Sequence, residues 1–221
     1  MASIPPTEMT LPELRAALAP LLPFHAAFDG WGEAALEQAG QELGVPADRA
    51  RLAFDGGAVA MIDAWFADVD ARMLEALPAE TLAGMKIRDR ITALVTARLQ
   101  AVADHREALR RAIAVLALPQ NVAAGTRLGW RAADAMWRAA GDTATDFAHY
   151  TKRLTLAGVY GSTLLVFLDD EEEDWPATRA FLDRRIAGVM RFEKFKARIK
   201  PDPDRHFSPL RFLGRLRYPA T

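Results

Sequence analysis

Residues 134–170 read DAMWRAAGDTATDFAHYTKRLTLAGVYGSTLLVFLDD, and the fold prediction starts from this stretch. Its apolar residues recur at helical spacing, which predicts two long helices at about 121–139 and 145–168. Thr145 and Asp146 are favourable N-cap residues, so we expect the second helix to begin there. The apolar faces of that helix are broad, and Lys152 and Arg153 are expected on its more polar side.

The same helical spacing continues on both sides of this stretch, and alternating strand-like runs are scarce. An apolar stripe from Leu11 to Leu21 is expected to end at Pro23. Further helices are predicted at 32–43, 47–54, 57–77, 87–99, 106–118 and 175–199, with Gly44, Gly56–Gly57 and Pro119 as breaks and Pro176 in the first turn of the last helix. The sequence therefore predicts an all-α fold.

Composition excludes several classes of protein. Of 221 residues 51% are hydrophobic, so a large core can form, and the net charge of −1 disfavours bulk nucleic-acid binding. The chain has no cysteine, which excludes disulfides and thiolate metal sites. No signal-like N-terminus and no run of about 18 apolar residues is present. We therefore expect a soluble, cytoplasmic protein, and the abundance of Ala and Arg fits a bacterial source.

Residues 1–56 are arranged like a helix-turn-helix domain, and LEQAGQELGVPADRARLAF resembles the corresponding part of the TetR family. Within residues 1–60, however, three basic side chains stand against eight acidic ones, a net charge of −5. Affinity for duplex DNA depends mostly on Lys and Arg that neutralise phosphates. We therefore expect this unit to be retained for packing and DNA binding to be unlikely.

The stretch from Asp134, with the following TRAFLDRRIAGVM, resembles the coenzyme Q (ubiquinone) biosynthesis protein nine family, a lipid-binding branch of the TetR-like fold. The resemblance covers about residues 23–190. It rests on Asp134, Trp137, Ala140, Gly141, Asp142, Thr145, Asp146, Phe147, Tyr150, Thr151, Lys152, Arg153, Leu156, Ala157, Val159, Tyr160, Thr163, Leu165, Asp169, Phe181, Leu182, Arg185 and Ile186. Ala148–His149 replaces the family's Asn-Trp, and Leu164 replaces its Glu.

The resemblance implies a protein that is not an enzyme, binds an isoprenoid quinone or other lipid, and presents it to a demethoxyubiquinone-type di-iron hydroxylase. The implied lipid-binding residues are Trp137, Phe147, Leu156, Tyr160, Leu165, Phe181, Leu182, Ile186 and Met190. The implied partner-binding residues are Asp142, Asp146, His149, Tyr150, Lys152 and Arg153. A homodimer is also implied. Periodicity alone leaves open an ordinary packed bundle without a lipid cavity.

The remaining parts of the expected domain scheme are a helical lipid-binding domain at 57–199 and a linker and tail at 200–221. From Arg184 to Thr221 eleven basic residues stand against three acidic ones. A short amphipathic helix is predicted in the tail, with Leu210, Phe212, Leu213 and Leu216 on one arc and Arg211, Arg215 and Arg217 opposite or at its edge. Such a helix binds anionic membranes weakly, so we expect a peripheral protein of the inner membrane.

No motif for catalysis or for a cofactor is recognisable. His25, His105, His149 and His206 have no partner at metal-ligand spacing, so neither a metal nor a cofactor is expected. Two other hypotheses stay open. One is a ligand-responsive TetR-type transcriptional regulator, which the net charge of −5 disfavours. The other is a catalytic role in the quinone pathway, which the missing catalytic residues disfavour.

Overall fold

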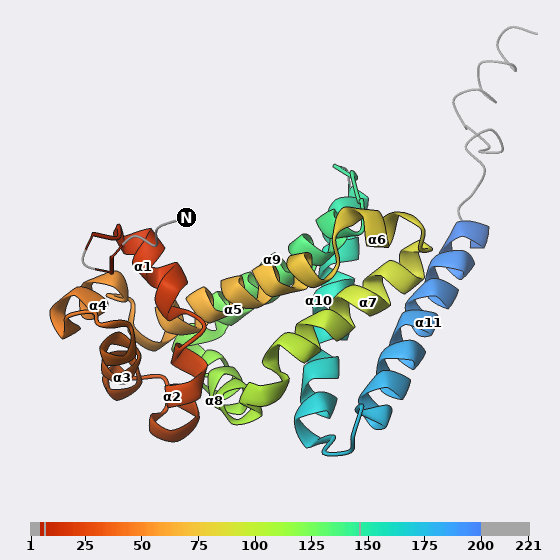
Figure 1. Cartoon of the computed structure of the whole chain (residues 1–221). Helices are drawn as coiled ribbons and strands as arrows, with labels where there is room; N and C mark the ends of the chain where they lie inside the picture. The colour runs from red at the N-terminus through yellow and green to blue at the C-terminus, as the bar shows by residue number, and fades with distance from the viewer. Residues whose placement is uncertain (1–4, 7, 146, 200–221) are drawn as a thin grey trace, which may run out of the picture. The chain divides into compact units, whose positions relative to one another are not determined.

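The computed structural model describes residues 5–6, 8–145 and 147–199, with side chains described as far as Arg191. Its contacts divide the chain into two compact units, Met1–Asp183 and Arg184–Thr221. All regular structure in the described residues is helical (Figure 1), as the sequence predicts. The boundary between the units falls inside the last helix, and the predicted three-part domain scheme remains a prediction.

Two short helices open the chain where the sequence predicts a single stripe. Helix α1 (Leu11–Leu18) begins with a capping box, in which Thr10 and Glu13 satisfy each other's backbone and side-chain groups. Helix α2 (Leu22–Asp29) follows at once. Pro23 lies in the first turn of α2, so the prediction that it ends a helix is wrong. A proline is tolerated there because first-turn amides need no partner inside the helix.

The next two helices have the arrangement of a helix-turn-helix. Helix α3 (Glu33–Leu43) ends at Gly44, whose φ of 73° lies in the left-handed region that glycine adopts without strain. Helix α4 (Ala47–Ala53) follows three residues later. Trp31, which precedes α3, stacks on Trp65 at 5.3 Å between ring centroids and donates from Nε1 to the carbonyl of Ala108 at 2.9 Å. This contact ties the first helices to the rest of the unit.

The central helices follow the prediction closely. They are α5 (Gly57–Ala76), α6 (Ala79–Ala83), α7 (Ile87–Val102), the 3₁₀ turn η1 (Ala103–His105), α8 (Arg106–Leu116) and the 3₁₀ turn η2 (Pro119–Asn121). Helix α6 was not expected, because five residues are too few to show a periodicity. Leu14, Ile62, Trp65 and Leu94 are among the large buried side chains of this core.

Helices α9 (Val122–Ala139) and α10 (Phe147–Asp169) pack against each other, and α7 and α5 contact α9. Helix α11 (Pro176–Ile199) begins in the first unit and continues into the second. Asp146, one of the two expected cap residues of α10, lies outside the described residues. No helix among the described residues meets the length and hydropathy needed to cross a bilayer.

Candidate functional site at the α9–α10 corner

A buried charge cluster joins α9, α10 and the loop between them. Arg153 of α10 has a side chain only 2% exposed, and its Nε donates to Asp134 of α9 at 2.6 Å. One terminal nitrogen of Arg153 donates to Asp142 of the loop at 3.0 Å and to the carbonyl of His149 at 3.2 Å. A planar guanidinium with several donors suits such bridging, so Arg153 fixes three segments at one point.

Asp142 is the second centre of the cluster, with a side chain 5% exposed. Lys152 donates from Nζ to Asp142 at 2.6 Å and lies 5.3 Å from the ring centroid of Trp137. Burial raises the pKa of Asp142, but the hydrogen bonds from Lys152 and Arg153 outweigh it and hold that pKa below its usual value. Trp137 in turn donates from Nε1 to the Lys152 carbonyl at 3.0 Å.

An aromatic cluster lies on the surface beside these charges. The rings of Trp130 and Tyr150 are 6.0 Å apart, those of His149 and Tyr150 5.2 Å, and those of Trp130 and His149 6.3 Å. His149 is held through Nδ1 against the carbonyl of Ala144 at 2.9 Å. Tyr150 is 61% exposed. Exposed aromatic rings on a rigid support are the residues that most often anchor a protein partner.

The predicted partner-binding residues therefore divide into two groups. Tyr150 is exposed and His149 half-buried in the aromatic cluster, and the side chains of Asp142 and Arg153 form its buried support. Lys152 is partly exposed, at 39% of its side chain. Trp130 was missed by the sequence reasoning, because its place beside Tyr150 depends on how α9 crosses α10. The sequence feature that could have identified Trp130 is its position seven residues before Trp137 on the same predicted helix.

The predicted lipid-binding residues do not converge on one cavity. Leu156 and Tyr160 are buried on one side of α10, where Tyr160 lies under the Arg98 guanidinium at 5.0 Å. Phe147 and Leu165 are exposed on the opposite side. Of the others, Trp137 and Phe181 are half-buried, Leu182 is buried, and Ile186 and Met190 belong to the second unit. A single helix cannot present both of its faces to one ligand.

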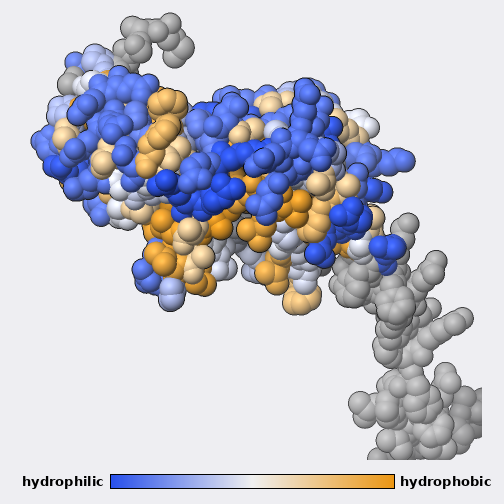
Figure 2. All heavy atoms as spheres, turned by 90° about the horizontal axis from the view of Figure 1, so that it is seen from below, coloured by the Kyte–Doolittle hydropathy of each residue, from blue (hydrophilic) through white to orange (hydrophobic). Residues whose placement is uncertain are grey.

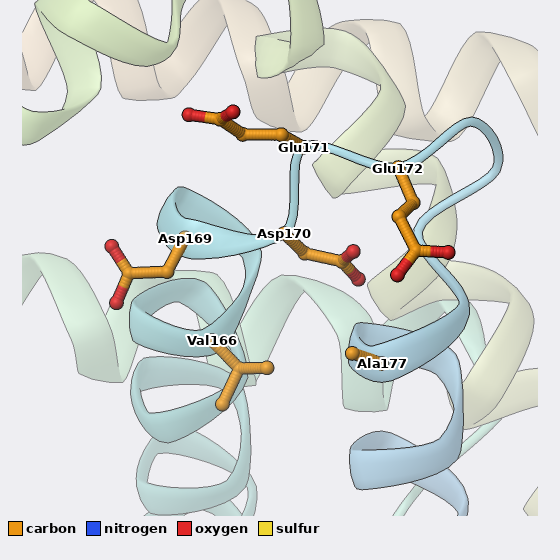
Figure 3. A pocket seen from close by; sticks show the side chains of 6 residues that line it. All are labelled: Val166, Asp169, Asp170, Glu171, Glu172 and Ala177. Atoms are coloured by element: carbon orange, nitrogen blue, oxygen red, sulfur yellow. The ribbon is translucent and has the colours of Figure 1, made fainter.

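A pocket of about 580 Å³ lies where α10 is followed by α11, and acidic side chains dominate it (Figure 3). Its lining consists of Val166, Asp169, Asp170, Glu171, Glu172 and Ala177. Asp170 accepts from the backbone and the hydroxyl of Thr178, both at 2.7 Å. Burial raises the pKa of Asp170, but the hydrogen bonds from Thr178, together with that from the Glu172 backbone and the nearby Arg106 charge, outweigh it and lower that pKa. Because carboxylates line it, this pocket does not suit an apolar tail.

The arginines of α4, the helix that corresponds to a recognition helix, are engaged within the chain. Arg51 forms ion pairs with Glu37 and, at 3.4 Å, with Glu33, both on α3. Arg49 donates to the carbonyl of Met9. These contacts hold both guanidinium groups against neighbouring elements, which opposes phosphate binding.

Some of the predicted site residues lie in parts of the chain that the structure does not describe. The predicted membrane residues Leu210, Arg211, Phe212, Leu213, Arg215, Leu216 and Arg217 lie outside the described residues, as does Asp146. Within the part of the chain that the structure describes, no group of three or more His, Cys, Asp or Glu is placed to hold a metal ion.

Comparison with known proteins shows that the segment containing both clusters matches a protein family. The COQ9 family model matches residues 122–193, which include both clusters. The mitochondrial ubiquinone biosynthesis protein COQ9 of Rattus norvegicus is 31% identical over 178 residues, covering 77% of this chain and 57% of that protein. COQ9-B of Xenopus laevis is 40% identical over 96 residues, or 43% of this chain and 33% of that protein. The chain spans about half the length of the curated relatives it matches over most of its own length.

A solved structure supports the fold. The TetR transcriptional regulator from Nitrosomonas europaea aligns with a TM-score of 0.65 at 25% identity, over 81% of this chain and 99% of that one. The order of helices, the matched segment 122–193 and the COQ9 relatives agree with one another, and the chain belongs to the COQ9 family with a TetR-like fold.

Proposed function

We propose that this protein is a lipid-binding accessory protein of ubiquinone biosynthesis and not itself an enzyme. It would bind an isoprenoid quinone intermediate and present the head group to a ring-modifying, di-iron hydroxylase at the membrane. The proposal takes the pathway from the printed names of the COQ9 relatives. The observation that carries it is the exposed aromatic cluster on its buried ionic support, inside the segment that matches the family.

The physical purpose of such a protein follows from its ligand. A long isoprenoid tail is almost insoluble, because each buried CH₂ group favours transfer out of water by about 0.8 kcal/mol. An enzyme that modifies the ring therefore needs a protein that brings the ring to it. Mass spectrometry of lipids that copurify with the full chain is the direct test. We expect an isoprenoid quinone or a biosynthetic precursor of one, and copurification of phospholipids alone would contradict lipid presentation.

The aromatic cluster is proposed as the docking surface for the hydroxylase. Substituting Tyr150→Ala should weaken association with the purified hydroxylase of the same organism at least tenfold, because exposed tyrosines contribute strongly at the centres of interfaces. Leu52→Ala is the matched control, since Leu52 is 62% exposed on α4, away from the cluster. Equal losses for the two variants would show that the cluster is not the docking surface.

The basic tail is proposed to hold the protein peripherally on the cytoplasmic face of a bacterial inner membrane. Truncation before Arg205 should abolish flotation with liposomes that contain anionic lipid, and flotation of the intact chain should weaken with salt. Flotation of the truncated chain would exclude the tail as the contact. In a deletion strain we expect demethoxylated or earlier quinone intermediates to accumulate, and an unchanged quinone profile would count against the whole proposal.

We also propose that the protein functions as a homodimer. Among the described residues, α10 exposes Phe147, Leu154 and Leu165 to water. Figure 2 shows that hydrophobic side chains gather on one face of the molecule. Sedimentation equilibrium of the full chain tests this assembly directly.

A further inference from the structure

A buried guanidinium group on α7 has a hydrogen-bond donor that the protein leaves unused. The side chain of Arg98 is only 2% exposed, and one of its terminal nitrogens donates to Asp70 of α5. Its Nε–H group is shielded from water and has no acceptor among the described residues. A buried donor without an acceptor destabilises a fold, so this one requires a physical explanation.

Another arginine of the same unit shows that burial does not by itself leave donors unused. Arg153 is buried to the same extent as Arg98. It donates from Nε to Asp134, and from a terminal nitrogen to Asp142 and to a backbone carbonyl. The fold therefore supplies three acceptors to one buried guanidinium group and a single carboxylate to the other.

The charges around Arg98 balance one another. Asp70 accepts from Arg98 and also pairs with Arg131 of α9, whose Nε lies 3.5 Å from the carboxylate. Arg131 in turn donates to Asp63 of α5. Two guanidinium groups and two carboxylates thus form a neutral network across α5, α7 and α9. An anionic ligand at Arg98 would be repelled by Asp70, so the unused donor suits a neutral acceptor.

The other neighbour of the Arg98 guanidinium group is the buried side of α10. The guanidinium carbon lies 5.0 Å from the centre of the Tyr160 ring, and Leu156, one turn earlier on α10, is also buried. Both residues belong to the predicted lipid-binding set. A single polar donor beside apolar side chains is the arrangement that orients the polar end of a largely apolar ligand.

We propose that Arg98 positions the head group of the quinone intermediate by donating from Nε to a ring carbonyl oxygen, beside Leu156 and Tyr160. A carbonyl oxygen accepts hydrogen bonds and donates none, so it matches an N–H group that lacks an acceptor. A donor that carries a charge also forms the stronger kind of hydrogen bond. The inference rests on the proposed binding of an isoprenoid quinone and assigns the residue that holds its ring.

Entry of a ring at Arg98 requires α7 and α10 to move apart. Helix α10 packs most extensively on α9 and much less on α7, so separation from α7 disrupts fewer contacts. The ion pairs of Arg153 with Asp134 and Asp142 hold α10 to α9 during such a movement. Because α5 packs closely on α7, the ion pair between Arg98 and Asp70 also stays intact. Arg98 therefore keeps its carboxylate when the ring arrives.

The Arg98→Lys substitution tests the donor while preserving the charge. Lysine keeps a cation for Asp70 but has no counterpart of the Nε–H group. Isothermal titration calorimetry of the full chain with decylubiquinone, a quinone with a short saturated tail, measures the dissociation constant. We expect Arg98→Lys to bind at least tenfold more weakly than the wild type, because a hydrogen bond from a charged donor contributes at least this factor.

Arg106→Lys is the matched control. Arg106 of α8 is half-buried, and its donors are used by the backbone carbonyls of Phe167 and Asp170. Its substitution should lower stability and leave the dissociation constant for decylubiquinone unchanged. An equal loss of affinity in the two variants would overturn the assignment to Arg98.

Infrared spectroscopy of the bound quinone detects the hydrogen bond directly. The carbonyl stretching band of decylubiquinone on the wild type should lie at lower frequency than in hexane, where no donor is present. This measurement needs no variant, and an unshifted band would overturn the inference whatever the affinity of Arg98→Lys.

The outcomes separate this inference from the function on which it rests. If wild type and Arg98→Lys bind decylubiquinone equally, Arg98 does not position the ring, and the proposed lipid binding stands. If the wild type neither binds decylubiquinone nor copurifies with a quinone, the proposed function fails and the inference fails with it.

Discussion

Arg153 shows how the role of a residue can differ from the one its helix position predicts. The sequence placed it on the more polar side of α10, and the family resemblance implied that it contacts a partner. The structure buries it between Asp134 and Asp142, carboxylates that lie 19 and 11 residues earlier in the chain. The spacing of residues along one helix contains no information about carboxylates that another element supplies. Of the predicted partner-binding residues, Tyr150 is exposed and His149 half-buried, so their rings remain available to a partner.

The first prediction concerns Asp142. The Asp142→Asn substitution should lower the free energy of unfolding by about 2–4 kcal/mol, because Arg153 would keep its buried charge with one carboxylate fewer. Asp183→Asn is the control, since Asp183 and Arg88 form an exposed pair at 3.8 Å that should contribute almost nothing. Urea unfolding at pH 7 measures both. A loss of unfolding free energy no greater than that of the control would show that the charge cluster does not stabilise the packing of α9 on α10.

The same variant gives a pH signature. The pKa of Asp142 is held below its ordinary value of 3.8, so the folded protein binds this proton more weakly than the unfolded chain. The stabilisation is therefore complete above that value and is lost as the pH falls through the lowered pKa. The difference in stability between wild type and Asp142→Asn should shrink over this acidic range and stay constant from pH 5 to 7.

The helix α10 has two faces with different purposes. The buried face carries Leu156 and Tyr160, and the exposed face carries Phe147, Leu154 and Leu165. Periodicity predicted the helix and its broad apolar character. It could not separate core residues from surface residues, because both faces of α10 are apolar. Only the positions of the helices packed against α10, which include α9 and α7, distinguish them.

The second prediction concerns the junction of α10 and α11. Asp170 is 5% exposed and satisfies two donors of Thr178. Asp170→Ala should lower the free energy of unfolding by about 1–3 kcal/mol, because the buried amide of Thr178 would lose its acceptor. Asp169→Ala is the adjacent control: Asp169 is exposed at the C-terminus of α10, where a negative charge is unfavourable, so its removal should be neutral or slightly stabilising. Thermal unfolding followed by circular dichroism would compare the two.

The N-terminal helices keep the arrangement of a helix-turn-helix without its electrostatics. In the first 60 residues eight acidic side chains outnumber three basic ones, and the α4 arginines bind within the chain. The likeness to a TetR regulator therefore describes the architecture of most of the chain. The chemistry of its surface differs where a regulator would contact DNA.

The third prediction concerns binding of duplex DNA by the full chain. Fluorescence anisotropy with a labelled 30-base-pair duplex should show no saturable binding by the full chain at physiological salt, since few phosphates could be neutralised. A DNA-binding TetR domain with its operator serves as the positive control. Salt-dependent binding that disappears with Arg51→Ala would restore the regulator hypothesis.

By itself the sequence determined the all-helical fold, most helix boundaries and the family, because helical periodicity, caps and a long motif are local features. It also located the α9–α10 corner through the residues of that motif. Tertiary structure alone decided that Arg153 and Asp142 are buried, that Trp130 joins His149 and Tyr150, and that Phe147 and Leu165 face away from Leu156 and Tyr160. These facts depend on which helices cross and where, and such long-range packing leaves no periodic signal along a single chain.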